Sequence, residues 1–560
     1  MRKSTGFALL SIFITGLVLR LLPLLGNLYW GGDFGEYFFI TRGLVENGSI
    51  SLSYDGWGFT YPYFPGSIFL NGVVGFTIVS LPMAVSLTSV ILASLSVFPV
   101  FMIARTLFHE DSTSLIAASV IAVSMPVVFT TSHASPGAVG DLLFATGLLL
   151  LVKAQFNPKM YYLLFPVSIA LIMTHHLTTY FLIIAVLGSV FIRELISKKS
   201  DVKALRLSII YLIFLIGSAF LYWATYAIPF RDVVMSKVLG SWVVVLGVFL
   251  IGVIGLYAIV QLRRKSEWSY RPRYPGLANR AVSLLVGLVI IYFIMSVNIY
   301  VQIPGTTITP SDWAFVFFTP LMVMFAFGAA GRGFSDYTKR GLDPTSWFIT
   351  ITASLFLASV FASDVIIPYR HLQYMMPASA VLVGLGLSRM AGLMGATNKK
   401  RKVVAGALIT TLFVMLAFSA HPQKDLLDRL DEGVPAKLVS NAFFAGLYID
   451  GLVASDHMAS TTLFGFGGVN ATWDTAHDTL LAGSFNEARA EMEGVESPSG
   501  RKRVDYVAHH RDMEKGVMLY PWNPAPVPSA EVVNKFNQAP FMKLFDNGYS
   551  KLYYVNWGLA

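Results

Sequence analysis

The chain has 560 residues, of which 55% are hydrophobic and 13% are charged, with a net charge of +9 and a mean hydropathy of +0.62. An average soluble domain carries about twice that charged fraction, so the composition excludes a soluble chain as well as a disordered chain, collagen and a coiled coil. Because cysteine is absent, disulfides, thiol nucleophiles and cysteine-ligated zinc are excluded too. The sequence predicts an integral membrane protein.

Apolar segments long enough to cross a bilayer recur along the first three quarters of the chain. The first, near residues 6–25, is followed by no cleavage site of small residues, so we interpret it as a retained helix rather than a signal peptide. A short apolar stretch at 68–81 contains Asn71 and glycines, and it is interpreted as an interfacial or re-entrant helix. Twelve further spans are expected near 84–103, 114–129, 142–152, 161–173, 177–191, 207–227, 238–260, 281–300, 313–330, 347–361, 376–387 and 403–420. The predicted fold is mainly α, a polytopic membrane protein of about thirteen transmembrane helices.

The distribution of basic residues sets the orientation of these spans. With the N-terminus in the cytoplasm, the cytoplasmic loops contain 24 Lys and Arg residues, whereas the outer loops before residue 421 contain 4. This asymmetry follows the positive-inside rule, and it would be lost if 68–81 were counted as a span. It predicts a cytoplasmic N-terminus, and it explains the basic net charge without a nucleic-acid partner.

The composition changes after residue 420. Residues 421–560 carry mixed charge, a proline-rich run at 521–528 and short alternating stretches such as 551–555. A segment of this size is large enough for a hydrophobic core of its own. We therefore expect a transmembrane catalytic region at 1–420, whose first outer loop spans about 27–83, and an extracytoplasmic soluble α/β domain at 421–560.

Acidic residues near the ends of spans are candidates for chemistry, because ionisable groups at membrane depth are costly and are retained for a role. Asp33 follows the first span beside glycines and aromatic residues, and Glu36 comes three residues later. A carboxylate shielded from bulk water could act there as a general base, and a solvated loop acid is the alternative. Asp141 begins the fourth span, where it is either a helix N-cap or a second acid for an acceptor or a metal.

Histidines and an arginine lie in the other outer loops. His133 lies in the second outer loop, and His175 and His176 form the next outer turn. Adjacent histidines point to different helix faces, and two of them make no metal site by themselves, so we expect at least one to pack structurally. Arg370 and His371 precede the twelfth span. A guanidinium there suits a lipid phosphate through two parallel hydrogen bonds, with interfacial anchoring as the alternative.

These motifs resemble the catalytic subunits of oligosaccharyltransferases, within the wider group of GT-C membrane glycosyltransferases. The resemblance rests on Asp33 with the segment 44–48, on the segment 61–66 before an interfacial helix, and on Arg370 seven residues before Pro377. It extends over the membrane region and includes thirteen spans followed by an outer soluble domain. It implies an integral membrane enzyme that uses polyprenyl-phosphate or polyprenyl-diphosphate sugars.

Two departures from that family bear on the activity. The Trp-Trp-Asp-Tyr-Gly motif that reads the acceptor sequon has Thr472, Trp473 and Asp474 as its nearest counterpart, and Pro310 stands where the loop after the ninth span would carry a glutamate. We therefore expect a GT-C enzyme that transfers a sugar from polyprenyl (dolichyl) phosphate to a glycan, lipid or protein acceptor. Oligosaccharyltransferase-type N-glycosylation is the alternative.

The resemblance implies a mechanism at the outer membrane face. Asp33 orients or deprotonates the acceptor, which attacks the anomeric carbon and inverts it, while Arg370 and His371 bind the phosphate of the sugar donor. Because lipid phosphate is a good leaving group, no dedicated general acid is required. Further candidates for contacts with the acceptor, or for supporting the site, are Glu36, His133, Asp141, His175 and His176.

A divalent ion is the cofactor that the sequence leaves open. The oligosaccharyltransferases that this chain resembles hold such an ion between acids of the first two outer loops and a glutamate of the loop after the ninth span. Asp33 and Asp141 match the first two acids, but two carboxylates with water bind Mg²⁺ or Mn²⁺ weakly. We expect a metal-independent enzyme, with a Mg²⁺ or Mn²⁺ site at these two acids as the alternative.

Two other classes of membrane protein are alternatives to an enzyme. A flippase of lipid-linked sugars would show repeated halves and broken helices at the bilayer midplane, whereas a structural protein would need no gathered acids. The sequence shows no convincing repeat, and its ionisable residues gather at the outer interface. Convergence of Asp33, Asp141 and Arg370 on one cavity would separate the enzyme from both alternatives.

Overall fold

The computed structural model describes residues 2–193, 202–238, 341–361, 370–395, 399–418, 420–421, 432–497, 500–519 and 525–559. The predicted spans near 281–300 and 313–330, almost all of the span near 238–260, and Pro310 lie outside the described residues.

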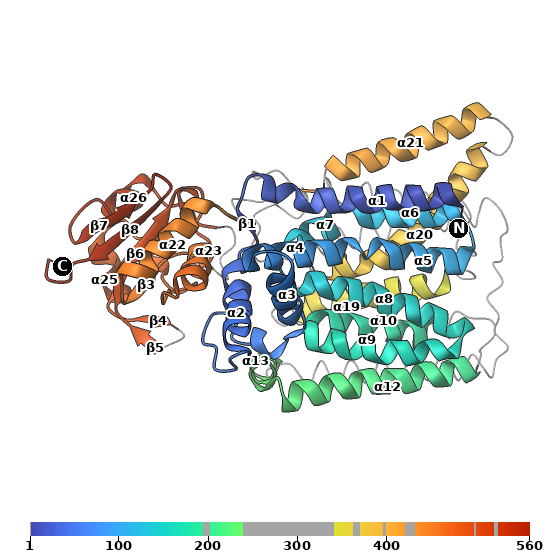
Figure 1. The fold of residues 1–560 in the computed structure, drawn as a ribbon, viewed down its shortest axis with the longest axis horizontal. Helices are drawn as coiled ribbons and strands as arrows, with labels where there is room; N and C mark the ends of the chain where they lie inside the picture. Colours follow the sequence, from blue (N-terminus) through green and yellow to red (C-terminus); the bar gives the residue numbers. More distant parts are fainter. Residues whose placement is uncertain are drawn as a thin grey trace.

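A bundle of apolar helices makes up the first and larger part of the chain, and its members run alongside one another (Figure 1). Within the described residues they are α1 (Lys3–Leu21) with the turn η1 (Leu22–Leu25), α4 (Leu81–Ser94), α5 (Val97–Phe108), α6 (Asp111–Val123), α7 (Met125–Ser132), α8 (Pro136–Phe156), η3 (Pro158–Met160), α9 (Tyr161–Thr174), α10 (His176–Leu187), η4 (Gly188–Ile192), α12 (Val202–Thr225), α19 (Leu342–Phe361), α20 (Arg370–Gly395) and α21 (Lys399–Phe418). The chain is therefore mainly helical, as predicted.

Several of these helices satisfy the length and hydropathy of a membrane span. Four stretches in the described part do so, and they are Lys3–Leu25, Leu81–Phe108, Pro136–Phe156 and Lys203–Thr225. The pair α6 and α7 forms a fifth candidate that bends by 48°. The bend falls at Ser124, and Pro126 follows it in the first turn of α7, where a missing N–H costs no hydrogen bond. The count of thirteen spans stays a prediction.

Small residues let the helices of the bundle approach one another closely. A side chain at Gly384 of α20 would collide with the backbone of α6 at Thr113, and one at Gly16 of α1 would press on Ala122 of α6. Close packing of this kind holds helices together in lipid, where the hydrophobic effect between them is absent. Large side chains such as Trp347, which is fully buried, fill the remaining interior.

Short helices cover one end of the bundle. α2 (Phe34–Asn47), α3 (Gly66–Thr77) and α13 (Ile228–Val238) lie at that end, away from the N-terminus (Figure 1). α3 exposes apolar side chains, among them Val73 and Phe76, which are 61% and 80% exposed. An exposed apolar face suits a helix that lies in the membrane interface, which is the interpretation given to this stretch of sequence.

The C-terminal part lies beyond the same end of the bundle (Figure 1). A four-stranded sheet in the order β3-β6-β8-β7 forms its centre; β3 and β6 are parallel, and the other neighbours are antiparallel. Its elements in the described residues are α22 (Ala436–Tyr448), β3 (Leu452–Ala454), α23 (His457–Thr462), η6 (Leu463–Gly467), α24 (His477–Leu481), α25 (Phe485–Met492), β4 (Val495–Ser497), β5 (Gly500–Lys502), β6 (Val504–His510), η7 (Arg511–Glu514), α26 (Ala530–Lys535), β7 (Phe541–Asp546) and β8 (Ser550–Val555). Mixed strands and helices accord with the α/β composition, while a domain boundary at residue 421 stays a prediction.

A two-stranded antiparallel sheet joins the C-terminal part to the loop after α1, which is the predicted first outer loop. β1 (Tyr29–Trp30) pairs with β2 (Gly433–Val434), in register from Tyr29 with Val434. Beside this sheet the backbones at Gly35 and Thr461 lie so close that a side chain at position 35 would not fit, and Gly465 packs on Gly35 in the same way. Through these contacts the C-terminal part packs closely against the start of α2.

Candidate functional site

Asp33 lies at the junction of the bundle and the C-terminal part, where hydrogen bonds fix its carboxylate. It precedes α2, where it makes no capping hydrogen bond. Its Oδ1 accepts a hydrogen bond from His457 Nε2 at 2.9 Å, and its Oδ2 accepts one from the hydroxyl of Tyr61 at 3.0 Å and a longer one from Tyr37 at 3.4 Å. The side chain remains 31% exposed. Asp33 is therefore fixed through both oxygens yet still accessible, unlike a solvated loop acid.

His457 is the contact that sequence reasoning missed. It opens α23, and its ring lies between two carboxyl groups: Nε2 is 2.9 Å from Asp33 Oδ1, and Nδ1 is 3.1 Å from Asp474 Oδ1. The edge of the Trp57 ring meets the imidazole with 4.8 Å between ring centres, and only 12% of the His457 side chain is exposed. Because 424 residues separate Asp33 from His457, no local pattern in the sequence signals this pair.

The charges at this contact follow from its surroundings. Burial alone would lower the pKa of His457, but the hydrogen bonds and charges of Asp33 and Asp474 outweigh it and hold the pKa well above its usual value. Burial would likewise raise the pKa of Asp33, and the hydrogen bond and charge of His457 instead bring it below its usual value. At neutral pH the site therefore holds an imidazolium against an ionised Asp33.

His133 lies at the same end of the bundle, next to the joint that the paired strands β1 and β2 form between the bundle and the C-terminal part. Its Nε2 is 3.3 Å from Glu432 Oε2, and that carboxylate also accepts the backbone N–H of Gly32 at 3.1 Å. The ring of Trp30 stacks on the imidazole with 6.1 Å between centres. Burial lowers the pKa of His133, although Glu432 opposes this effect. His133 therefore supports the turn that precedes Asp33 rather than contacting that acid.

Glu36 is fully buried and holds the first outer loop together. Its carboxylate accepts the hydroxyl of Tyr54 at 2.6 Å and the backbone N–H of Gly58 at 3.0 Å. Burial and the neighbouring charge of Asp33 raise the pKa of Glu36 to about 7. The structure thus places Glu36 behind Asp33, in the interior of the loop.

Arg370 begins α20 at this end of the bundle, where it is half-buried. Its positive charge acts on Asp33, His133 and Asp141 alike, and it lowers the pKa of the first two. The structure therefore gathers these predicted residues within electrostatic reach of one guanidinium. Their roles in binding or catalysis stay predictions.

Asp141 lies inside α8, whose N-cap is Ser135, so the interpretation of Asp141 as a helix N-cap is wrong. The helix begins earlier because Pro136 occupies its first position, which suits proline. Asp141 is buried, and its Oδ2 accepts a hydrogen bond from Gln373 Nε2 at 2.8 Å. Gln373 lies on α20, three residues after Arg370. Asp141 thus ties α8 to the helix that carries the guanidinium.

The remaining predicted histidines make contacts inside the bundle. His175 Nδ1 lies 2.7 Å from the hydroxyl of Thr178, and the ring of His176 packs on Phe230 with 4.4 Å between centres. His371 is fully buried, with Nε2 2.9 Å from the hydroxyl of Ser354. These positions suit packing, while phosphate binding by His371 and acceptor contacts by His175 and His176 stay predictions.

The described residues do not fit a divalent ion held between Asp33 and Asp141. The two oxygens of Asp33 accept hydrogen bonds from His457 and Tyr61, and the Oδ2 of Asp141 accepts one from Gln373. No group of three or more His, Asp or Glu side chains in the described part is arranged to hold a metal. Whether the enzyme needs a metal ion stays a prediction.

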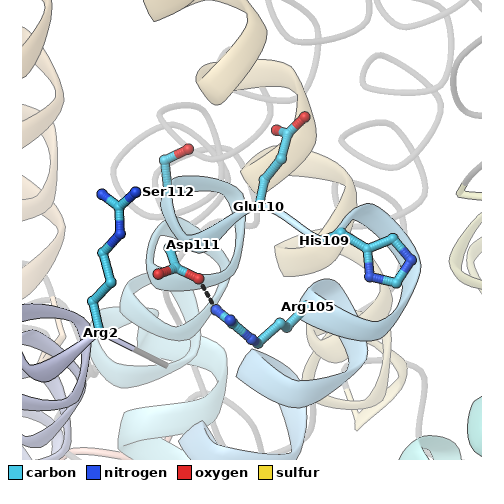
Figure 2. Close-up of a pocket in the computed structure, with 6 residues that line it drawn as sticks. All are labelled: Arg2, Arg105, His109, Glu110, Asp111 and Ser112. Carbon is cyan, nitrogen blue, oxygen red and sulfur yellow. Dashed lines mark ion pairs between the residues drawn. The ribbon is translucent and has the colours of Figure 1, made fainter.

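An open cavity of about 680 Å³ lies at the opposite end of the bundle, beside the N-terminus (Figure 2). Arg105 and Asp111 form an ion pair in its wall, and Asp111 also accepts a hydrogen bond from Thr5 at 2.7 Å. Figure 2 shows Arg2 and His109 at opposite sides of this ion pair. This cavity is separate from the Asp33 site.

Comparison with known proteins identifies the fold. No protein-family model matches the chain, and no curated protein matches it in sequence. Among solved structures, the oligosaccharyltransferase AglB from Archaeoglobus fulgidus, in complex with an inhibitory peptide and a dolichol-phosphate, is 15% identical with a TM-score of 0.54, covering 92% of this chain and 70% of its own. ArnT from Cupriavidus metallidurans, bound to undecaprenyl phosphate, is 12% identical with a TM-score of 0.51, covering 99% of both chains.

An oligosaccharyltransferase from Archaeoglobus fulgidus in complex with Zn and sulfate is 14% identical, with a TM-score of 0.56, covering 99% of this chain and 74% of its own. At such low identity these likenesses establish the fold alone. The predicted resemblance to GT-C membrane glycosyltransferases is thereby confirmed at the level of the fold.

Proposed function

We propose that the chain is a membrane glycosyltransferase that transfers a sugar from a polyprenyl-phosphate donor to an acceptor at the end of the bundle where Asp33 lies. One observation carries the proposal. The carboxylate of Asp33 is ionised, fixed by hydrogen bonds and partly exposed, and the positive charge of Arg370 acts on it at the same end of the bundle. The shared fold supports it, since AglB and ArnT hold dolichol-phosphate and undecaprenyl phosphate in their solved structures.

The proposed reaction displaces a lipid phosphate. An acceptor hydroxyl or amide hydrogen-bonds to Asp33 and attacks the anomeric carbon of the donor sugar, on the face opposite the phosphate, so the configuration inverts. The bond between the anomeric carbon and the phosphate oxygen breaks, and the electron pair leaves with the polyprenyl phosphate. Arg370 neutralises the charge that develops on that phosphate, and Asp33 accepts the acceptor's proton.

The described residues favour simple glycosyl transfer over recognition of a glycosylation sequon. The nearest counterpart of the sequon-reading motif is occupied in other contacts: Asp474 holds His457, while Trp473 is 4% exposed and packs on Phe464. An acceptor bound at Asp33 would therefore meet His457 rather than these side chains. We accordingly propose a glycan, lipid or protein acceptor without a fixed sequon.

Donor consumption by the purified full-length protein tests the proposed function. Labelled polyprenyl-phosphate and polyprenyl-diphosphate sugars are incubated with the protein and a membrane extract as the source of acceptor. We expect the monophosphate donor to be consumed, and Asp33→Asn to reduce the rate by about 10²-fold, because the amide cannot accept the proton. Asp55→Asn, an exposed acid of the same loop, is the control that keeps the rate. Failure of the wild-type protein to consume either donor would refute the proposal.

The need for a metal ion is a second property of the proposed reaction. We propose that transfer proceeds without a metal ion, so excess chelator should leave the rate unchanged. Complete loss of activity on chelation, restored by Mn²⁺ or Mg²⁺, would instead favour the oligosaccharyltransferase alternative and make Asp141 a metal ligand.

A further inference from the structure

His457 links the C-terminal part of the chain to the acid proposed as the base. The contact is short, at 2.9 Å, and it reaches Oδ1 of Asp33 while Tyr61 takes Oδ2. A carboxylate with a different partner on each oxygen cannot rotate about its own bond without breaking one of them. His457 and Tyr61 together therefore fix the plane of the carboxylate.

The backbone of His457 is anchored on both sides. Its N–H donates to the carbonyl of Met518 at 2.9 Å, and the preceding Asp456 caps α23 through the N–H of Ala459 at 3.0 Å. Four residues further along, the hydroxyl of Thr461 donates to the carbonyl of Gly32, next to Asp33, at 2.7 Å. The imidazole of His457 thus projects from the short helix α23, which is hydrogen-bonded to the turn that precedes Asp33.

Asp474 fixes the ring from the other side. Its Oδ1 lies 3.1 Å from Nδ1 of His457, and the side chain is 10% exposed. An acceptor on Nδ1 holds the ring orientation and favours a proton on that nitrogen, so Nε2 faces Asp33. Asp474, His457 and Asp33 thus form a chain of contacts, in which Asp33 is the most exposed of the three side chains.

Two other His–Asp pairs in the C-terminal part show what a local pair looks like. The pair of His510 and Asp456 is buried, with exposures of 2% and 1%, and the pair of His477 and Asp478 is exposed, with 36% and 59%. Each of these pairs stays within the C-terminal part. Only His457 among the three reaches an acid of the first outer loop.

We propose that His457, oriented by Asp474, is a positioning residue for the transfer reaction: it holds the Asp33 carboxylate in one orientation, so the C-terminal part completes the site of the membrane bundle. This inference rests on the proposed function of Asp33. It assigns to α23 a role in the reaction, and it makes the joint between the two parts a requirement for turnover rather than for folding alone.

Kinetics of transfer separate positioning from a structural role. We expect His457→Ala to lower kcat by at least about tenfold, with the KM for the sugar donor unchanged because Arg370 binds that substrate. His457→Gln should recover part of the rate, since the amide still donates one hydrogen bond to Asp33, and Asp474→Ala should resemble His457→Ala. His477→Gln, in the exposed pair, is the control that keeps wild-type kcat and KM. Wild-type kcat in His457→Ala would overturn the proposal.

A double-mutant cycle on thermal stability tests the link without any substrate. The full-length protein in detergent is compared with Asp33→Asn, His457→Ala and the double variant. We expect the double variant to unfold at nearly the temperature of His457→Ala, because His457→Ala has already removed the contact. The pair Asp33→Asn and His477→Gln should give additive shifts instead.

The two experiments fail in distinguishable ways. Additive shifts for Asp33 and His457 would show that the two side chains do not interact, and this would overturn the positioning role whatever the activity. A strong coupling in a protein that consumes neither sugar donor would refute the proposed function and, with it, the role in transfer, while leaving the contact established.

Discussion

Arg370 is the residue on which recognition of the sugar donor depends in the proposed mechanism. A guanidinium offers two parallel hydrogen bonds to a phosphate, and an ammonium is a point charge that does not reproduce this geometry. We expect Arg370→Lys to raise the KM for the polyprenyl-phosphate donor by about tenfold and Arg370→Ala to raise it further, with the KM for acceptor little changed. Steady-state kinetics with varied donor measure this effect.

The control for that prediction is Arg231→Lys. Arg231 also lies at this end of the bundle, but it is 43% exposed and paired with Asp232 at 2.8 Å. It should keep wild-type kinetics. Equal donor KM values in Arg370→Lys and the wild-type protein would assign Arg370 to interfacial anchoring.

Glu36 makes the stability of the first outer loop depend on pH. Its pKa is raised to about 7 in the folded protein, above that of an unfolded glutamate, so the folded state binds the proton more tightly. Its contribution to stability is therefore greatest below the unfolded pKa and falls as the pH rises through about 7. Between about pH 5 and about pH 8, the Tm of the wild-type protein should fall more steeply than that of Glu36→Gln. Parallel curves for the two proteins would contradict this assignment.

The predictable residues were those with an ionisable side chain beside an apolar span. Asp33, Asp141 and Arg370 stand out in this way because charge is rare at membrane depth. His457 could not be found so, since it lies in a polar stretch and its partner is 424 residues away. The N-cap interpretation of Asp141 failed for a local reason that was visible: Ser135 followed by proline is itself a helix start.

At the scale of elements, the fit of α2 against the C-terminal part depends on Gly35. A Cβ there would overlap the backbone at Thr461, which cannot move like a flexible side chain. We expect Gly35→Ala to destabilise the protein by about 1–3 kcal/mol, as overpacking does, and to reduce transfer because the joint carries His457. Thermal unfolding and donor consumption measure the two effects.

Gly43 provides the matched control in the same helix. Nothing lies within 4 Å of the position that its Cβ would occupy. Gly43→Ala should therefore gain about 0.5–1 kcal/mol from helix propensity and keep full activity. If both alanine variants had the same thermal stability, the close packing at Gly35 would make no contribution to the stability of the protein.

Element boundaries were harder to predict than element type. Hydropathy shows where a span of sufficient length lies, and it found the helices of the bundle. It does not show breaks inside a span, because a turn of a few apolar residues leaves the average unchanged. The segment near 84–103 is accordingly divided between α4 and α5, and the segment near 114–129 bends by 48° between α6 and α7.

At the scale of the whole molecule, the prediction to test is orientation. The absence of cysteine makes single-cysteine labelling straightforward. With an impermeant maleimide on intact cells, Ser53→Cys in the first outer loop and Glu514→Cys in the C-terminal part should react, whereas Ser112→Cys should react only after lysis. All three side chains are exposed in the structure. Labelling of Ser112→Cys alone on intact cells would reverse the topology.

The overall architecture was predictable because its causes are global. Composition gave a membrane protein, and the asymmetry of basic loops gave an orientation that puts the first outer loop and the C-terminal part on one side. The structure places both at the same end of the bundle (Figure 1). How those two parts dock was not predictable, because β1 is two residues long and its partner strand is too short to leave a pattern.

The pairing of β1 with β2 has a consequence for biosynthesis. A ribosome makes the chain from its N-terminus, so Tyr29 and Trp30 emerge long before Gly433 and Val434 exist. The helices of the bundle can insert during that interval, but Asp33 has neither its neighbouring strand nor His457 until residues 433–457 have been made. A chain stalled before these residues would therefore lie in the membrane without a finished site, and the proposed activity would begin only after the C-terminal part has been made.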